Sequence, residues 1–525
     1  MDFKKYSSIL VALLGVAVGA LLVLTVDQYK ASRKKIRAEY GEWRKLNLIL
    51  ESVEDMYVDT IDYKGVTDAA ISAALSSLDP HSIYMPPVEL EKSEEDLSGN
   101  FEGIGIQFNV PNDTAIVLEV IPGGPSEKIG LQPGDRLLKV GDEVIAGVSF
   151  PQDSMVKRMK GPSGTKVKLN VLRDGEEIPF EITRGKIPVN SIDAAFMVND
   201  TTGYLRLSKF ARTTTAEFAA ATLELCSAGM KHLVFDLRDN TGGYLDQALN
   251  LSNLFLPKGA GIVYLEGLHR PKEEYKADGK GFLQDIGLTV LINESTASSS
   301  EIFAGSIQDN DRGKIVGRRS FGKGLVQEPL FFTDGSGVRI TVARYYTPSG
   351  RCIQKPYGED YEYDIFKRYA DGEMTEADSI KVNKDEVYYT VGGREVYGGG
   401  GIVPDVFVPI DTTKVTSFYM QCTRKATTMR YASAYFDGHK AELSSIDTYD
   451  ALLKYLDDAG LESGFLRFAA EKDGIKPENV AEWKESAEYM MPQIRALIGR
   501  YSKLGDKAYY HIFLEIDETY KKALN

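Results

Sequence analysis

The chain has 525 residues, of which 62 are Lys or Arg and 76 are Asp or Glu, so its formal net charge is −14. This length predicts about three to four domains, and the acidic balance excludes the basic footprint that nucleic-acid binding needs. The three cysteines are far apart, which excludes a disulfide framework and a paired-cysteine metal site. The five histidines form no zinc motif. We therefore expect no metal and no cofactor.

Residues 9–26 form an apolar run with Thr25 as its one polar member, after Lys4 and Lys5. The run is long enough to span a bilayer, and it is longer than the apolar region of a cleaved signal peptide, which is the alternative. We predict an uncleaved membrane helix within residues 1–27. The basic residues that follow would by themselves keep the bulk of the chain in the cytoplasm, although long domains can cross a membrane despite such charges.

Residues 28–98 predict a helical region. Apolar residues recur at three- and four-residue steps over residues 43–56, and an alanine-rich run covers residues 66–78. The segment 79–82 then ends the helical pattern, because the residue before a proline avoids the α conformation. His81 in this segment is interpreted as a structural turn residue.

Residues 99–188 predict a small β-rich module of short strands separated by turns. Asp174 and Gly175 give a strong two-residue hairpin signal. The module begins with an alternation of glycine and apolar residues, formed by Gly103, Ile104, Gly105 and Ile106. A dinucleotide-binding fingerprint is discarded here, because Phe108 stands where its third glycine is required and no helix follows.

The order of these strands resembles a PDZ domain, and residues 131–140 follow that family's L-x-x-G-D-x-L-x-x-V run. The resemblance implies that the backbone N–H groups of residues 103–106 bind the carboxylate at the C-terminus of a peptide. The peptide would then pair as an added strand. Protein or peptide substrates recognised through their C-termini are therefore the expected partners.

Residues 189–410 alternate between apolar, strand-like runs and helical runs, which predicts a mostly parallel sheet with sites at the carboxyl ends of its strands. Two such ends, residues 239–243 and 294–300, carry glycine and polar residues, so chemistry is expected there. The expected strands are residues 202–208, 233–238, 262–266, 288–292 and 314–317, and the expected helices are residues 214–228, 245–255 and the run after Ser298.

Ser298 follows a predicted strand and precedes a predicted helix, with Glu301 three residues later. Ser-x-x-Glu is the pattern of a helix capping box, which alone would explain the serine. The same turn suits a nucleophile, because a helix N-terminus offers free N–H groups and a partial positive charge. A serine nucleophile needs a base. Lys323 could serve, since its apolar, glycine-rich setting favours a buried amine with a lowered pKa.

Two other kinds of site fit part of this sequence pattern. Residues 317–323 fit the G-x-x-x-x-G-K pattern of a phosphate-binding loop, but Gly324 replaces the required Ser or Thr and a strand-like run follows instead of a helix. A Ser-His-Asp triad is harder to exclude. No histidine lies in the glycine-rich strand ends, however, and His232 precedes its strand and therefore lies at the opposite edge of the sheet.

Residues 293–327 resemble the catalytic block of the C-terminal processing (tail-specific) serine peptidases. The family pattern S-A-S-A-S-E-I reads T-A-S-S-S-E-I here, and F-G-K-G-x-V-Q is also present. The resemblance implies that Ser298 is the nucleophile, Lys323 the general base and Gln327 the residue that orients the lysine. Residues 236–243 are similar to the family's D-L-R-x-N-x-G-G, which implies an oxyanion hole formed by the N–H group of Gly242 or Gly243 with that of Ser299.

The likeness covers roughly residues 46–409 and includes the segments 78–82, 346–351 and 400–405. Residues 355–389 are charged, rich in tyrosine and poor in aliphatic residues, and are interpreted as an exposed insertion outside the family pattern. Residues 411–525 predict a helical domain without an assignable motif. Its expected helices are residues 417–435, 449–459, 462–471, 481–501 and 506–524.

The sequence thus predicts a multi-domain α/β and β protein. Its parts are a membrane helix (1–27), a helical region (28–98), a PDZ domain (99–188), a serine peptidase core (189–410) and a helical C-terminal domain (411–525). The expected function is that of a serine endopeptidase with a Ser-Lys dyad. On the family resemblance the bulk of the chain is expected in the periplasm or otherwise outside the cytoplasm, with the helical regions as candidates for a homo-oligomer contact. The alternative is a catalytically inactive, membrane-tethered PDZ scaffold.

Overall fold

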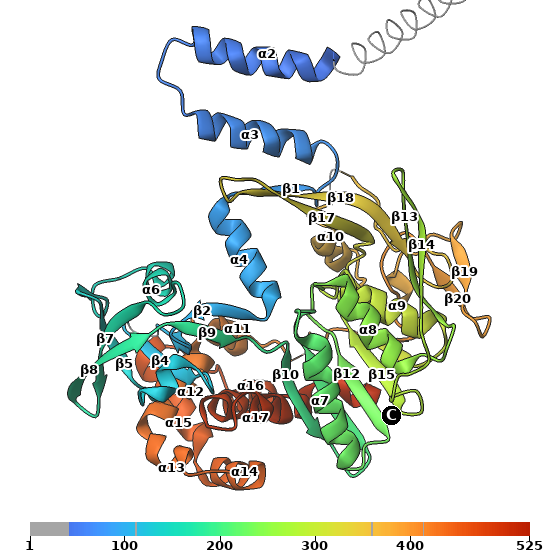
Figure 1. Cartoon of the computed structure of the whole chain (residues 1–525). Coiled ribbons are helices and arrows are strands. Elements are labelled where there is room, and N and C mark those ends of the chain that lie inside the picture. Colours follow the sequence, from blue (N-terminus) through green and yellow to red (C-terminus); the bar gives the residue numbers. More distant parts are fainter. Residues whose placement is uncertain (1–40, 111–112, 359–360, 413, 525) are drawn as a thin grey trace, which may run out of the picture. The chain divides into compact units, whose positions relative to one another are not determined.

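The structure is a computed structural model that describes residues 41–110, 113–358, 361–412 and 414–524 (Figure 1). The predicted membrane helix lies outside these residues. Within the described part of the chain, every helix is too short or too polar to cross a bilayer.

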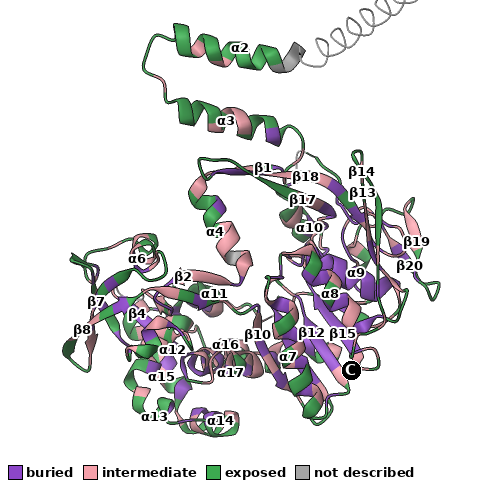
Figure 2. Ribbon diagram, in the orientation of Figure 1, coloured by how far each residue is buried: buried purple, intermediate pink, exposed green. Residues whose placement is uncertain are grey.

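The chain divides after Ala74 into two compact units. The first unit contains the helix α2 (Gly41–Met56) and most of α3 (Tyr63–Ser76), which confirms the helical prediction for this region. Large apolar side chains on α2 are exposed to solvent, among them Ile49 and Met56 at 60% and 80% exposure (Figure 2).

Residues 106–183 in the second unit form a six-stranded antiparallel sheet in the order β3-β4-β5-β7-β8, with β6 paired to β5. The predicted hairpin is present between β7 and β8, where Asp174 and Gly175 have φ angles of 52° and 86°. The apolar core of this module includes Leu137, Leu169 and Met155, all 0% exposed. β3 lies at the edge of the sheet, so one side of its backbone is open. The elements are β3 (Ile106–Asn109), β4 (Ala115–Val120), β5 (Arg136–Val140), β6 (Glu143–Val144), β7 (Lys166–Arg173), β8 (Glu176–Thr183), α5 (Pro125–Lys128) and α6 (Gln152–Met159).

Two short strands connect this module to the rest of the unit. β2 (Asn100–Gly103) pairs antiparallel with β9 (Gly185–Pro188), so the chain enters and leaves the module side by side. The helix α4 (Pro87–Ser98) precedes β2 and ends at Gly99, whose left-handed conformation terminates it.

The predicted parallel sheet is confirmed by a six-stranded sheet in the order β10-β11-β12-β15-β16-β21, in which only β10 runs antiparallel to its neighbour. The connecting helices α7, α8 and α9 agree closely with the expected ranges. The elements are β10 (Ile192–Met197), β11 (Thr202–Leu207), β12 (His232–Asp236), β15 (Gly287–Ile292), β16 (Lys314–Gly317), β21 (Val406–Phe407), α7 (Thr214–Ser227), α8 (Leu245–Phe255) and α9 (Ser299–Asp309).

A second, antiparallel sheet lies beside it, in the order β1-β18-β13-β14, with β17 also paired to β18. The strand expected at residues 262–266 is present as β13 but belongs to this sheet. The reason is local, because the two residues between β13 and β14 allow only an antiparallel hairpin. The elements are β1 (Ile83–Met85), β13 (Gly261–Gly267), β14 (Arg270–Lys276), β17 (Leu325–Phe331) and β18 (Gly337–Tyr346).

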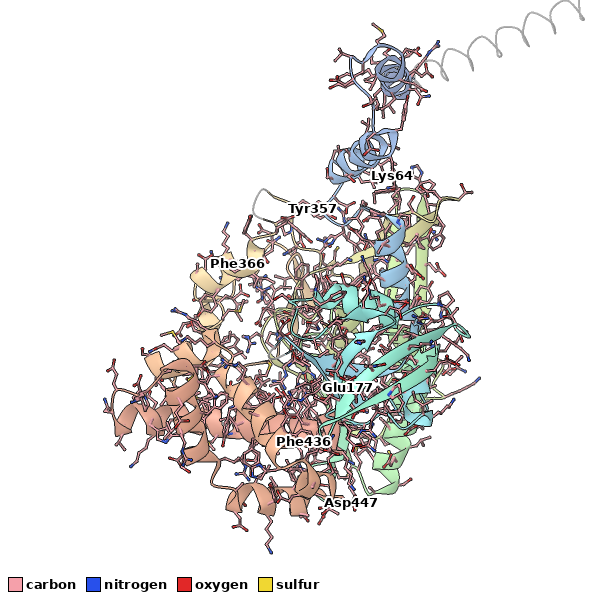
Figure 3. All side chains as sticks on the ribbon, turned by 90° about the vertical axis from the view of Figure 1, so that its left-hand side faces the viewer. Lys64, Glu177, Tyr357, Phe366, Phe436 and Asp447 are labelled. Carbon is pink, nitrogen blue, oxygen red and sulfur yellow. The ribbon has the colours of Figure 1, made fainter. Side chains whose placement is uncertain are left out.

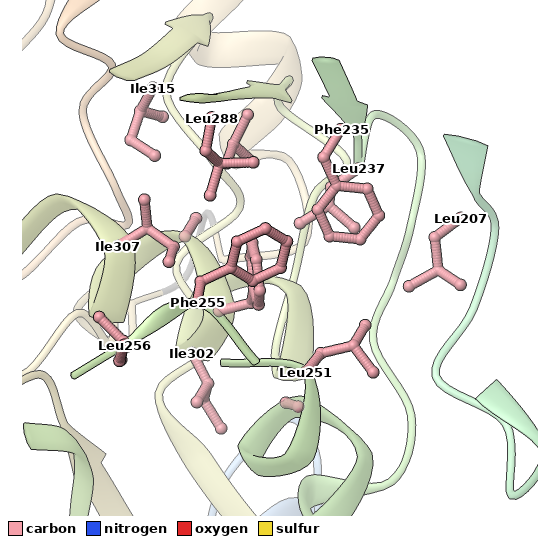
Figure 4. Packing of buried hydrophobic residues seen from close by; sticks show 14 of the residues in the cluster. Leu207, Phe235, Leu237, Leu251, Phe255, Leu256, Leu288, Ile302, Ile307 and Ile315 are labelled. Atoms are coloured by element: carbon pink, nitrogen blue, oxygen red, sulfur yellow. The ribbon is translucent and has the colours of Figure 1, made fainter. Parts of the chain in front are cut away.

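The largest apolar cluster lies between the parallel sheet and its helices (Figure 4). Phe235 of β12 contacts Phe218 of α7 and Phe303 of α9 edge-on, with ring centroids 5.1 Å apart in both pairs. α9 is buried along its whole length. The buried helix α9 therefore holds the turn that leads into it in place.

Residues 417–523 are helical, as predicted, with two breaks that the pattern did not indicate. Ala426 adopts a left-handed φ of 51°, which separates α11 from α12. Asp517 separates α17 from α18, because its side chain caps α18 by accepting from the Tyr520 N–H at 3.0 Å. The helices are α11 (Ser417–Arg424), α12 (Thr427–Gly438), α13 (Lys440–Ser444), α14 (Tyr449–Asp458), α15 (Leu461–Phe468), α16 (Val480–Tyr501), α17 (Gly505–Phe513) and α18 (Glu518–Ala523).

The prediction that residues 355–389 are an exposed insertion is only half right. Tyr357 and Phe366 are exposed, at 40% and 73% (Figure 3), but Arg368 and Glu373 are 4% and 3% exposed. Arg368 and Glu373 are buried because they pair with each other, with Arg368 Nε 2.8 Å from Glu373 Oε1. The polar composition of the segment predicted that it is exposed, but a charged side chain can be buried when it is paired with an opposite charge.

Candidate active site

Ser298 lies at the turn between β15 and α9. Its φ and ψ are 57° and −118°, a conformation that is costly for a residue with a side chain and that is characteristic of functional turns. The capping box is present, and the Ser298 N–H donates to Glu301 Oε2 at 2.9 Å. Ser298 is partly exposed, and its Oγ is hydrogen-bonded to no other side chain of the described residues. The turn thus presents a hydroxyl to solvent at a helix N-terminus.

Lys323 lies in the loop between β16 and β17. The glycines on either side are required by close packing, since a Cβ at Gly324 would lie 2.9 Å from the Gln354 N and one at Gly322 would lie 3.1 Å from the Gly401 N. Lys323 Nζ donates to Gln327 Oε1 at 2.8 Å. Burial, followed by the charge of Arg339, lowers the pKa of Lys323, whereas Glu301 and Asp79 oppose this shift. The amine is therefore easier to deprotonate than a free lysine.

Gln327 connects this lysine to His81. The Gln327 Nε2 donates to the His81 carbonyl oxygen, so the amide oxygen is the atom that faces Lys323. The His81 ring itself contacts Tyr361, with Nε2 2.6 Å from the Tyr361 hydroxyl. Burial, followed by the charge of Lys323, lowers the pKa of His81 to about 4, so the ring is neutral at neutral pH. The structural interpretation of His81 thus omitted its place beside the lysine.

Glu301 holds the two loops of the site together. Its carboxylate is 0% exposed and accepts from the backbone N–H groups of Ser298, Gly322 and Lys323, at 2.9, 2.7 and 2.9 Å. The Ser320 hydroxyl also donates to it. The sequence indicated only the hydrogen bond to Ser298, because the capping pattern is local and the other donors follow some twenty residues later.

Tyr345 makes a second link between the same two loops. It is 1% exposed, and its hydroxyl lies 3.1 Å from the Ser298 carbonyl oxygen and within hydrogen-bond distance of the Lys323 carbonyl oxygen. The Ser298 hydroxyl and the Lys323 amine are not directly hydrogen-bonded to each other in this structure, and such bonds often tighten only when substrate binds. The turn that carries Ser298 and the loop that carries Lys323 are therefore linked by hydrogen bonds to their backbones.

The loop after β12 lies against this turn. A Cβ at Gly242 would lie 2.8 Å from the Ser298 Cβ and 2.9 Å from the Ser299 N, so only glycine fits there. The Gly242 N–H already donates to Asn240 Oδ1 at 2.9 Å. Among the described residues, the N–H groups of Gly243 and Ser299 have no acceptor. The Ser299 hydroxyl donates to the Gly243 carbonyl oxygen at 2.9 Å, which holds these two residues together.

The charged residues of the 236–238 segment form a buried network behind this loop. Asp236 is 0% exposed, lies 2.6 Å from Arg238 Nη2 and accepts from the Tyr204 hydroxyl at 2.7 Å. Although burial alone would raise it, the charges of Arg238 and Arg206 hold the pKa of Asp236 well below its usual range. Arg238 also contacts Asp517 of the helical domain at 2.6 Å. The network therefore positions a loop of the site and joins it to the C-terminal helices.

The predicted carboxylate-binding residues Gly103, Ile104, Gly105 and Ile106 belong to the β-rich module, from the end of β2 to the start of β3. Within the described chain, the N–H groups of Ile104 and Gly105 donate to no acceptor. The Ile104 carbonyl oxygen accepts from the Ser126 N–H at 3.0 Å and from its Oγ at 2.7 Å. These bonds fix the loop beside the open edge of β3.

Comparison with known proteins agrees with this arrangement. Residues 201–364 match the peptidase family S41, residues 103–183 match the PDZ domain, and residues 418–502 match a family of unknown function, DUF8443. A "Probable CtpA-like serine protease" of Staphylococcus haemolyticus is 31% identical over 412 residues, which are 74% of this chain and 82% of that protein. A protein with the same description from Staphylococcus epidermidis is 32% identical over 359 residues, 67% of this chain and 72% of that protein.

A solved structure titled "Photosystem II D1 C-terminal processing protease" is 27% identical, with 70% of this chain and 86% of that chain covered and a TM-score of 0.37. The fold and the sequence likeness define a serine protease with a PDZ domain. The chain belongs to the peptidase family S41, among the CtpA-like serine proteases.

Proposed function

We propose that this protein is an endopeptidase in which Ser298 is the nucleophile and Lys323 the general base. The observation that carries the proposal is the environment of Lys323. Its side chain is partly buried, its pKa is lowered, and among the described residues its amine donates to one side chain, the neutral amide of Gln327. A lysine without a carboxylate partner can be neutral and accept a proton, as a general base must.

The reaction follows from these positions. Neutral Lys323 Nζ takes the proton of the Ser298 hydroxyl as Oγ attacks the carbonyl carbon of the substrate peptide bond. The resulting oxyanion accepts hydrogen bonds from Gly243 and Ser299, whose N–H groups have no acceptor within the described chain. We assign this role to Gly243 and not to Gly242, because the Gly242 N–H is occupied by Asn240.

The second half of the reaction returns the protons. The Lys323 ammonium protonates the nitrogen of the leaving peptide as the C–N bond breaks, which leaves an ester on Ser298 Oγ. Lys323 then takes a proton from water as the hydroxide oxygen attacks this ester. The same proton returns to Ser298 Oγ as the acid product leaves.

Comparison of the purified wild type with Ser298→Ala and Lys323→Ala tests this proposal on a protein substrate. Both variants should lose hydrolysis while their circular dichroism is unchanged. A serine-directed phosphonate should add its mass to the wild type and not to Ser298→Ala. Hydrolysis by Ser298→Ala at the wild-type rate would exclude Ser298 as the nucleophile. Absence of both hydrolysis and labelling in the wild type would favour the inactive PDZ scaffold.

We further propose that the PDZ domain binds substrates by their C-termini. The open edge of β3 and the acceptor-free N–H groups of Ile104 and Gly105 support this proposal. Two peptides that differ only in a free or an amidated C-terminus provide the test. The free acid should have a clearly lower KM, and equal KM values would contradict the proposal.

The apolar run of residues 9–26 supports a further proposal, that the chain is anchored in a membrane with its bulk outside the cytoplasm. Cell fractionation should place the full chain in the membrane fraction. Protease added to spheroplasts should degrade it, whereas protection from that protease would place the bulk inside.

A further inference from the structure

Residues 361–374, here called the clamp segment, belong to the stretch 355–389, for which the sequence predicts an exposed insertion outside the family pattern. The structure instead places the segment against the loop that carries Lys323. Arg368 Nη2 donates to the Arg319 carbonyl oxygen at 2.6 Å, and Arg368 Nη1 donates to the Ser320 carbonyl oxygen at 3.1 Å. Glu373 accepts from Arg319 Nε and Arg368 Nε, both at 2.8 Å. The clamp segment therefore holds the backbone that leads to the lysine.

Tyr361 extends from the same segment toward the catalytic residues. It is 7% exposed, and its ring lies edge-on to that of His81, with centroids 5.4 Å apart. Lys355 Nζ lies over the Tyr361 ring at 4.3 Å and over the Phe321 ring at 4.0 Å. The ring is thus fixed from two sides, and its hydroxyl has a defined direction.

The Tyr361 hydroxyl makes two hydrogen bonds. Gln354 Nε2 donates to its oxygen at 3.1 Å, and the hydroxyl shares a second hydrogen bond with His81 Nε2 at 2.6 Å. The His81 carbonyl oxygen accepts from Gln327, and the Gln327 amide oxygen accepts from Lys323. One connected path joins the clamp segment to the lysine amine.

We propose that Tyr361 is a positioning residue for the general base, acting on Lys323 through His81 and Gln327. The inference rests on the proposed function and deepens it by giving the 361–374 segment a role in catalysis. Without the Tyr361 hydroxyl, the His81 ring loses a hydrogen-bond partner, and the His81 carbonyl is less firmly placed. Gln327 is then less firmly held, and the Lys323 amine is less often within reach of Ser298.

A change in the pH profile should accompany the loss of position. The charged groups that act on Lys323 are Arg339 of β18, Glu301 of α9 and Asp79 before β1, and those that act on His81 are Asp79, Lys323 and Lys355. The phenylalanine variant leaves all of these in place. It weakens the Gln327 acceptor that stabilises the lysine ammonium. The weaker acceptor lowers the pKa of Lys323, so the acid limb of the rate profile should move to lower pH.

The test is a double-mutant cycle with Tyr361→Phe and Gln327→Ala, measured as kcat, KM and the pH dependence of kcat/KM. Tyr361→Phe should lower kcat by roughly 10- to 100-fold, since small misplacements of catalytic groups cost up to ~10²-fold. KM should stay within about twofold, because Tyr361 has no proposed role in binding substrate. In the Gln327→Ala background the same substitution should have little further effect, since the path is already broken.

The matched control is Tyr363→Phe, which removes the hydroxyl of a tyrosine that is 64% exposed and two residues away. It should leave kcat and the pH profile unchanged. An equal loss of kcat from Tyr361→Phe in both backgrounds would overturn the inference, and this comparison holds even if the variant is less stable. A wild-type rate and a wild-type pH profile in Tyr361→Phe would also overturn the inference. A fully active Ser298→Ala would instead refute the proposed function itself.

Discussion

The buried carboxylate of Glu301 accepts the backbone N–H of Lys323 at 2.9 Å, with the same oxygen that accepts the Ser298 N–H. The nucleophile turn and the base loop are thus joined by one side chain that has no access to solvent. Burial raises the pKa of Glu301, and the hydrogen bonds from Ser320, Lys323, Gly322 and Ser298 oppose that rise.

Glu301→Gln tests this link. The amide nitrogen cannot accept a hydrogen bond, so at least one buried N–H or hydroxyl donor loses its partner. Each such loss costs about 1–3 kcal/mol. We expect a lower thermal midpoint and a kcat reduced by at least ~10-fold, since ~1.4 kcal/mol corresponds to tenfold in rate. Glu328→Gln, at an exposed position on β17, is the control and should match the wild type. Unchanged kcat in Glu301→Gln would show that the shared carboxylate is dispensable.

The pH dependence of kcat/KM reports on Lys323. The base acts only when neutral, so activity should rise with pH through the pKa of the lysine. The midpoint should lie below the value of about 10.4 for a free lysine, because burial lowers that pKa. A profile that is flat from pH 5 to 9 would count against a lysine base.

Arg339→Gln should move that midpoint in a known direction. The Arg339 charge lowers the pKa of Lys323, so its removal raises this pKa and shifts the acid limb to higher pH. Arg344→Gln removes an exposed arginine of the same strand and should leave the midpoint in place. A shift to lower pH in Arg339→Gln would contradict the electrostatic assignment.

Gly242→Ala should impair the oxyanion hole. The added Cβ would lie 2.9 Å from the Ser299 N, so the backbone that carries this N–H group would have to shift. Loss of one oxyanion donor costs about 10²–10³-fold in kcat. Gly259→Ala is a matched control, because that glycine also has a positive φ, of 86°, but no neighbouring atom within 4 Å of a Cβ. A kcat for Gly242→Ala equal to that of Gly259→Ala would show that the position of this N–H group does not matter to the reaction.

Asp236→Ala should destabilise the peptidase core. It leaves Arg238 and Arg206 buried without their shared carboxylate, and breaking a buried ion pair costs about 3–5 kcal/mol. The pKa of Asp236 is held low in the folded state. The stability that it provides is therefore complete at neutral pH and is lost only as acid protonates it. Chemical denaturation followed by circular dichroism measures the loss, and the exposed Asp200→Asn should change it little.

Much of the fold could be predicted because its signals are local. The strands β12, β15 and β16 and the helices α7 and α8 follow from apolar periodicity, and the Asp174-Gly175 turn from its need for positive φ. The assignment of β13 to a second sheet could not be predicted, since pairing partners are a property of the whole chain. The same holds for the break at Ala426, where the sequence contains no helix-breaking residue.

The family resemblance and the candidate residues Ser298, Lys323 and Gln327 can be read from the sequence alone, because they lie in contiguous motifs whose residue types are required by the proposed chemistry. The surroundings of these residues depend on the folded chain. Glu301 meets the lysine loop, Tyr361 meets His81, and Asn240 occupies the Gly242 N–H while that of Gly243 has no acceptor within the described residues. These contacts join segments that are far apart in the chain or depend on the direction of the backbone, and burial strengthens them. A local sequence pattern cannot predict such contacts or their burial.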